Sequence, residues 1–172
     1  MKVKNQITIE EVLNFQQLWG ESLVHIGNVY SEGGDYHKAA IRHITVFYGY
    51  HSGTVLFKPT MASVRQFRTD EAGALSYFAG GNPDYPEDRG FALKPWKSVR
   101  WENAGIKLLK NLALIMGNYF FTPADGNNET KVEFSICLEK DKKGNLRIIL
   151  HDSHLPFHSI TYWQWDNIVR RQ

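Results

Sequence analysis

The chain has 172 residues, of which 42% are hydrophobic and 13% aromatic, with a net charge of +2. This composition excludes a disordered chain and predicts one soluble domain with a substantial apolar core. The nearly balanced charge gives no electrostatic reason to expect nucleic acid as a partner, and the single cysteine, Cys137, excludes an internal disulfide. No apolar run has the length of a membrane span. Residues 1–6 lack the apolar segment of a signal peptide, so we expect no membrane partner and a cytoplasmic location.

Two amphipathic helices are expected first. Thr8 and Glu11 have the spacing of a capping box, and apolar residues then recur at helical spacing over 12–26. Gly33 and Gly34 mark the end of this helix or the loop after it, and Asp35 can cap a second helix.

From residue 54 onward the pattern predicts mainly strands. The strand candidates are 54–58, 64–68, 91–93, 98–103, 106–109, 112–121, 130–138 and 146–151, and a short helix is expected at 71–78. We therefore expect a single α+β domain over 1–172, with its core at about 8–157 and N-terminal helices packed on a strongly curved antiparallel sheet. The tail, 158–172, is expected to be a short amphipathic helix or an interface segment, since it carries Trp163 and Trp165.

Polar residues follow the last apolar strand, where His151, Asp152, Ser153 and His154 come shortly before a proline. Polar groups in such a place must be hydrogen-bonded or in contact with water. They therefore predict either a structural network or the floor of a pocket. Alternation along a strand puts His151 and Ser153 on one face and His154 on the other. Zinc binding by the imidazoles of His151, His154 and His158 would therefore require an additional turn.

Two further segments supply hydroxyl groups. One apolar strand candidate ends at Thr60, which strand alternation places on the same face as Leu56 and Lys58 unless Pro59 breaks the register. Thr60 could alternatively cap the following turn. Tyr77 lies in a short apolar run, where it is either a buried structural residue or a hydroxyl of a site.

Paired carboxylates stand beside a guanidinium at Glu87, Asp88 and Arg89. They could serve as acid and base groups. A neighbouring arginine keeps carboxylates ionised, so an ion pair that fixes the loop is the favoured interpretation.

Taken together, several segments resemble the iota-class carbonic anhydrases, which belong to the NTF2-like superfamily and are related to the association domain of calcium/calmodulin-dependent protein kinase. The resemblance covers about residues 12–157. It rests on the order and spacing of the segments 55–60 (VLFKPT), 66–68 (QFR), 74–78 (ALSYF), 87–92 (EDRGFA), 95–96 (PW), 132–134 (VEF) and 150–156 (LHDSHLP).

The resemblance implies a cone-shaped, usually dimeric fold and reversible hydration of carbon dioxide to bicarbonate. In the cyanobacterial and algal branch this reaction uses no metal or other cofactor. By motif, the hydroxyl groups would be those of Thr60, Tyr77 and Ser153 in an apolar pocket. His151 is a candidate proton relay or a structural residue. The family commonly has His-His-Ser-Ser where this chain has His-Asp-Ser-His, so Ser153 keeps its place while its neighbours change.

Two other functions stay open. A non-catalytic association module would form dimers or rings. A module that binds or isomerises a small apolar ligand would need a carboxylate base deep in its pocket, and the sequence places none there convincingly.

Overall fold

The structure, a computed structural model, describes residues 6–126 and 128–157. The described residues form α1 (Ile9–Ser31), α2 (Tyr36–Phe47), β1 (Leu56–Lys58), α3 (Glu71–Ala79), β2 (Trp96–Leu109), β3 (Leu112–Pro123), β4 (Thr130–Lys140) and β5 (Leu146–His154), with short 3-10 helices η1 (Tyr50–Ser52) and η2 (Phe91–Leu93). The strands form one sheet in the order β1-β5-β4-β3-β2. The predicted α+β class is confirmed. The predicted tail lies outside the described residues.

The helix starts expected from capping are confirmed. The Thr8 side chain accepts a hydrogen bond from the Glu11 N–H, and the Glu11 carboxylate accepts one from the Thr8 N–H. Asp35 caps α2, and Asp70 caps α3 in the same way. The apolar sides of these helices pack against the sheet and form one side of the core.

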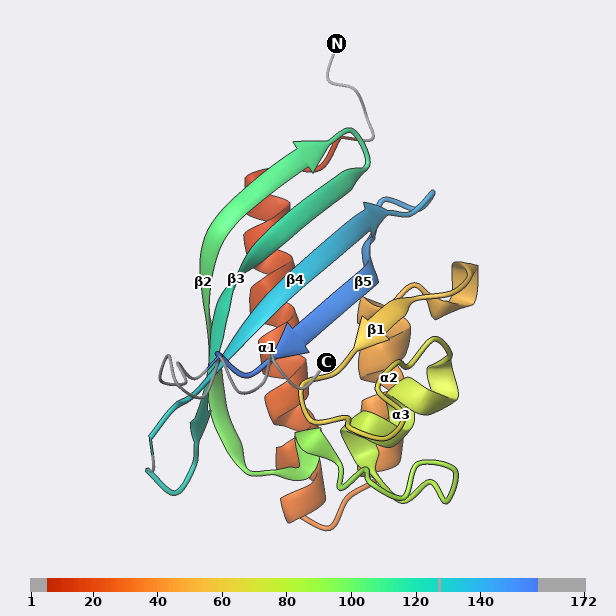
Figure 1. The fold of residues 1–172 in the computed structure, drawn as a ribbon, viewed down its shortest axis with the longest axis vertical. Coiled ribbons are helices and arrows are strands. Elements are labelled where there is room, and N and C mark those ends of the chain that lie inside the picture. The colour runs from red at the N-terminus through yellow and green to blue at the C-terminus, as the bar shows by residue number, and fades with distance from the viewer. Residues whose placement is uncertain (1–5, 127, 158–172) are drawn as a thin grey trace, which may run out of the picture.

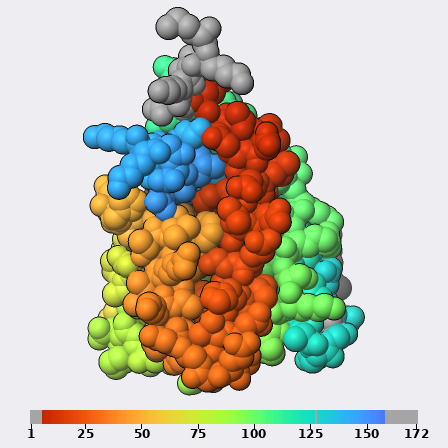
Figure 2. Space-filling view, turned by 180° about the vertical axis from the view of Figure 1, so that it is seen from behind, coloured from red at the N-terminus to blue at the C-terminus, as the bar shows by residue number. Residues whose placement is uncertain are grey.

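The sheet is strongly curved, and the long helix α1 lies along its inner side, as Figure 1 shows. Seen from behind in Figure 2, α1 and α2 lie side by side and cover that side of the sheet. The neighbouring pairs among β2, β3, β4 and β5 are antiparallel, but β1 pairs in parallel with β5. The sheet is therefore mixed, which corrects the expectation of a purely antiparallel one. The chain leaves α2 beside the start of β5, where Tyr48 forms a parallel bridge with Ile148, and β1 then runs in the same direction as β5.

The strands predicted at 98–103 and 106–109 are one continuous strand, β2. A register shift between Asn103 and Gly105 interrupts its pairing with β3 without ending it. Gly117 lies opposite this irregularity, where a Cβ atom would overlap the carbonyl oxygen of Glu102. The backbones of β2 and β3 approach closely at this position, so the bend requires glycine.

Two further strand candidates are wrong. Residues 91–93 form η2, and residues 64–68 are a loop without regular structure. In that loop the Arg68 N–H donates to the Phe57 carbonyl oxygen at 2.7 Å. Ala92 is buried in η2, but Val64 and Phe67 of the loop are exposed, so the apolar residues at 64–68 do not mark a buried strand.

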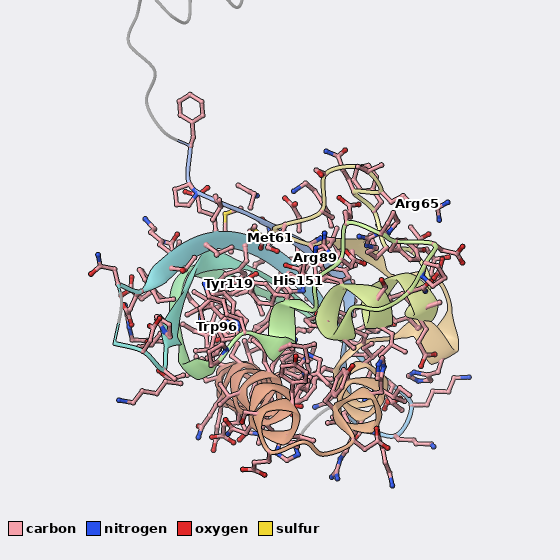
Figure 3. The ribbon with its side chains drawn as sticks, turned by 90° about the horizontal axis from the view of Figure 1, so that it is seen from below. Met61, Arg65, Arg89, Trp96, Tyr119 and His151 are labelled. Carbon is pink, nitrogen blue, oxygen red and sulfur yellow. The ribbon has the colours of Figure 1, made fainter. Side chains whose placement is uncertain are left out.

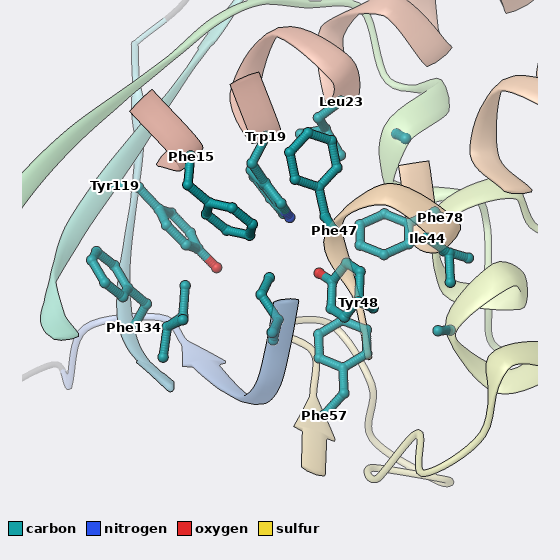
Figure 4. Packing of buried hydrophobic residues seen from close by; sticks show 14 of the residues in the cluster. Phe15, Trp19, Leu23, Ile44, Phe47, Tyr48, Phe57, Phe78, Tyr119 and Phe134 are labelled. Carbon is teal, nitrogen blue, oxygen red and sulfur yellow. The ribbon is translucent and has the colours of Figure 1, made fainter. Parts of the chain in front are cut away.

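The core lies between the sheet and the helices and is rich in aromatic rings. Figure 4 shows part of it, with Phe15 and Trp19 of α1 facing Tyr119 of β3 and with Tyr48 and Phe57 below Phe47. No helix among the described residues is both long and apolar enough to cross a membrane.

Candidate active site

The polar residues near the end of β5 belong to the strand and alternate between its two faces. His151 and Ser153 are 2% exposed and face the core. Asp152 and His154 face outward, where His154 Nδ1 lies 3.5 Å from the Asp152 carboxylate and Lys58 Nζ lies 3.6 Å from it. The two residues that depart from the family pattern therefore pair with charges on the outer face, and Ser153 is the hydroxyl group that points inward.

Thr60 meets Ser153 at this inner face. The two side-chain oxygens are 2.9 Å apart and share a hydrogen bond. β1 ends at Lys58, and Pro59 breaks the strand register. Leu56 and Lys58 lie on the outer side while Thr60 turns inward, which is the exception that a break at Pro59 was expected to cause.

Tyr77 of α3 and Tyr119 of β3 add two phenols to the hydroxyl pair. Burial raises the pKa of Tyr77, and the nearby Thr60 hydroxyl lowers it to a smaller extent. Burial also raises the pKa of Tyr119, against a smaller lowering by the hydroxyls of Ser153 and Thr60. Both phenols are therefore neutral near pH 7 and can donate hydrogen bonds. The structure brings the three predicted hydroxyl residues together and adds Tyr119.

His151 lies beside this hydroxyl cluster and is held by two tyrosines. Its Nδ1 is 3.1 Å from the Tyr48 hydroxyl, and its Nε2 is 3.4 Å from the Tyr119 hydroxyl. Burial lowers the pKa of His151 to about 3, so the imidazole is neutral near pH 7. Figure 3 shows His151 and Tyr119 in the interior between the sheet and the helices. A neutral imidazole bonded at both nitrogens can accept a proton at one and release one at the other.

The surroundings of the hydroxyl cluster are apolar. The Tyr77 ring stacks on Phe91 at a centroid distance of 5.4 Å and meets Phe57 edge to face at 5.8 Å. Trp19 and Phe57 pack on the His151 ring at 5.9 and 5.1 Å. Such a site excludes bulk water and strengthens each hydrogen bond formed inside it.

A buried ion pair fixes the loops that carry this site. Arg68 is fully buried, and its Nη2 donates to the Asp88 carboxylate at 2.7 Å, which also accepts from the Ser76 hydroxyl at 2.6 Å. Glu87 accepts from three consecutive backbone N–H groups at 63–65, which lower its pKa to about 2. The expected loop-fixing role of these carboxylates agrees with the structure, but their partner is Arg68 and not the adjacent Arg89.

This network stands directly beside the site in the chain. Ser76 precedes Tyr77, and the loop anchored by Glu87 begins three residues after Thr60. The ion pair therefore fixes the segments that carry Thr60 and Tyr77, and besides burial the charge of Asp88 also raises the pKa of Tyr77.

The described residues hold no cluster of three or more His, Cys, Asp or Glu side chains that could bind a metal ion. His151 and His154 lie on opposite faces of β5. His158, the third imidazole considered for zinc, lies outside the described residues.

The sequence reading missed Tyr119 and Tyr48. Tyr119 is one aromatic residue among several in β3, and Tyr48 directly follows α2. Each has the appearance of an ordinary core residue in the sequence. The only available signal was strand alternation, which puts Tyr119 on the same inward face as Ile115 and Phe121.

The fold and site define an α+β protein whose helices and curved sheet enclose a cluster of neutral hydroxyl groups. Residues 10–155 match the family of metal-independent carbonic anhydrases. The metal-independent carbonic anhydrase of Nostoc sp. strain PCC 7120 is 45% identical over 158 residues, which are 90% of this chain and 77% of that protein. The chain belongs to the metal-independent carbonic anhydrases.

A solved structure supports the same conclusion. The crystal structure of the iota-carbonic anhydrase from a cyanobacterium, complexed with bicarbonate, has a TM-score of 0.88 and 44% sequence identity. The alignment covers 92% of this chain and 98% of that one. The expected iota-class membership is therefore confirmed, and the expected link to the NTF2-like superfamily stays a prediction.

Proposed function

We propose that this carbonic anhydrase hydrates carbon dioxide reversibly to bicarbonate at the cluster of Thr60, Tyr77, Ser153 and Tyr119. The observation that carries the proposal is the bonded pair of Thr60 and Ser153 hydroxyls, 2.9 Å apart in an apolar interior. Carbon dioxide is small and apolar, so its site needs an apolar wall and a few groups that fix a water molecule and the bicarbonate oxygens. Each hydroxyl group can both donate and accept a hydrogen bond.

In the proposed mechanism, Tyr77 and Ser153 orient the attacking water while Thr60 holds an oxygen of the substrate. As the water oxygen bonds to carbon, negative charge develops on the carbon dioxide oxygens, and neutral hydroxyl donors stabilise it. Tyr119 is placed to support this role, because it is coupled to both Ser153 and Thr60. The attacking water loses one proton, for which His151 is the adjacent relay.

The test is stopped-flow hydration of carbon dioxide by protein treated with chelator and checked for metal content. We expect activity in the metal-free protein and a loss of about a hundredfold or more in Ser153→Ala, as for removal of one oxyanion donor. Ser135→Ala is the matched control, since Ser135 pairs with Asp152 in the sheet register and thus lies in the outward-facing row. Activity that appears only after zinc is added would contradict the hydroxyl mechanism.

The structure gives less support to the two alternatives. The buried carboxylate among the described residues is that of Asp88, and it is bonded to Arg68 and Ser76. It is therefore not free to act as the base that a ligand-isomerising relative would need. A non-catalytic association module would have no use for the buried hydroxyl cluster, and it would show no hydration activity with or without zinc.

A homodimer and a cytoplasmic location stay predictions. In support of a dimer, Leu114, Cys137, Leu150 and Leu56 are successive register partners across four strands on the outer face of the sheet. Leu56 is 57% and Leu114 43% exposed. An apolar row of this kind is suited to a second copy of the chain. Light scattering should give the mass of a dimer, and Leu114→Lys should give that of a monomer.

A further inference from the structure

His43 of α2 is a buried histidine that the proposed mechanism does not use. It is 0% exposed, and its Nδ1 lies 3.0 Å from the hydroxyl of Ser22 on α1. Its Nε2 is buried and has no hydrogen-bond partner among the described residues. Ser22 is half-buried, so its hydroxyl group can contact both His43 in the core and solvent at the surface of α1. His43 therefore has one nitrogen directed toward the surface and one toward the interior.

Trp19 of α1 has a buried ring nitrogen as well. Its indole Nε1 makes no hydrogen bond of ordinary geometry to a described residue, although burial raises the pKa of Tyr48 and the indole lies close enough to the Tyr48 hydroxyl to lower that pKa in part. The rings of Trp19 and His43 are 5.3 Å apart, and those of His43 and Tyr48 are 6.0 Å apart. Figure 4 shows the indole nitrogen of Trp19 and the hydroxyl group of Tyr48 turned toward the same part of the interior.

Polar atoms are rarely left without a partner in a protein interior, and internal water molecules typically make about three hydrogen bonds to such atoms. Three polar atoms from three parts of the chain are available here. The Trp19 N–H can only donate, the Tyr48 hydroxyl can do both, and His43 Nε2 can do either according to its tautomer. Together they offer one water molecule a complete set of partners.

We propose that Trp19 Nε1, His43 Nε2 and the Tyr48 hydroxyl bind one internal water molecule, and that this water connects His151 to Ser22 as the exit route for the proton. The relay part rests on the proposed function. The route starts at the hydroxyl cluster, where Tyr119 is bonded to His151, and ends at the surface of α1.

The route conserves protons at every step. Hydration converts one carbon dioxide and one water into one bicarbonate and one proton. His151 takes this proton at Nε2 through Tyr119 and releases one from Nδ1 to the Tyr48 hydroxyl, which passes its own to the internal water. The water protonates His43 Nε2, and His43 releases its Nδ1 proton to Ser22, which gives one to bulk solvent. Hydroxyl rotation and tautomer exchange in the two imidazoles restore the starting state.

Burial lowers the pKa of both His43 and His151 to about 3, so neither ring holds a resting charge near pH 7. A relay through such rings must therefore be concerted, with each imidazole releasing a proton from one nitrogen as it accepts another at the opposite nitrogen.

Steady-state kinetics in weak buffer test the relay with Ser22→Ala and His43→Phe. Proton export follows the chemical step, so we expect kcat to fall about tenfold while kcat/KM stays near that of the parent protein. Added imidazole should restore kcat by carrying protons in place of the route. His37→Gln is the control, since His37 is an exposed histidine on the same helix and should change neither constant.

If kcat and kcat/KM fall together without rescue by imidazole, His43 is structural and the relay is overturned. A parent protein without hydration activity would overturn the proposed function and the relay with it. The water site has its own readout, a high-resolution crystal structure. Density for a water within hydrogen-bond distance of Trp19 Nε1 and His43 Nε2 is expected, and an unoccupied interior at that point would overturn the site whatever the kinetics show.

Discussion

The two buried histidines predict that the protein loses stability in mild acid. Burial lowers the pKa of His43 and of His151 to about 3 in the folded state, whereas an unperturbed histidine has a pKa of about 6.5. Below pH 6.5 the unfolded chain therefore binds protons that the folded chain does not. The free energy of unfolding falls as the pH drops from about 6.5 toward 3, and the contribution of these residues is fully present above pH 6.5.

The size of the effect depends on how far the pH lies below the pKa of about 6.5 that each histidine has in the unfolded chain, as long as it stays above the folded value of about 3. One pH unit corresponds to about 1.4 kcal/mol for each group. Between about pH 7.5 and pH 5.0 each histidine should lower the free energy of unfolding by roughly 2 kcal/mol, and the pair by roughly 4 kcal/mol. That is a large part of the 5–15 kcal/mol typical of a domain.

Urea unfolding at pH 7.5 and pH 5.0 measures this difference directly. In His43→Phe, which keeps an aromatic ring in the core, the pH-dependent loss should shrink by about half. His37→Gln should leave it unchanged, because His37 is exposed. If His43→Phe keeps the full pH dependence of the parent protein, the argument from buried neutral imidazoles is refuted.

Three further substitutions have definite expected outcomes. Tyr77→Phe should lower kcat/KM for hydration by about a hundredfold or more with an unchanged melting temperature, because it removes a donor and keeps the ring; activity near that of the parent would remove Tyr77 from the mechanism. Tyr119→Phe should cause a smaller loss of activity, since Ser153 keeps its bond to Thr60; wild-type rates would show that Tyr119 is only structural. Asp88→Asn should lower the free energy of unfolding by about 2–3 kcal/mol in chemical denaturation, because it leaves the buried charge of Arg68 only its longer pair with Glu87 at 3.6 Å. A change below about 1 kcal/mol, the range of an exposed pair, would contradict that explanation.

Local rules were enough for much of this protein. The capping box at Thr8 and the Asp35 cap depend on contacts within a few residues, and the sequence predicts them correctly. Strand alternation placed His151 and Ser153 on one face for the same reason. The resemblance of segments far apart in the chain predicted that Thr60, Tyr77 and Ser153 belong to one site without any geometric argument.

Tertiary structure decided what depends on contacts between distant segments. The turn of Thr60 toward Ser153 follows from the end of β1 at Pro59, and the parallel pairing of β1 with β5 brings the two residues together. The choice of Arg68 over Arg89 as the partner of Asp88 depends on which guanidinium the fold buries, not on which is adjacent in the chain. Tyr119 is indistinguishable from a core aromatic in the sequence because its role comes from the hydroxyl groups that other strands place beside it.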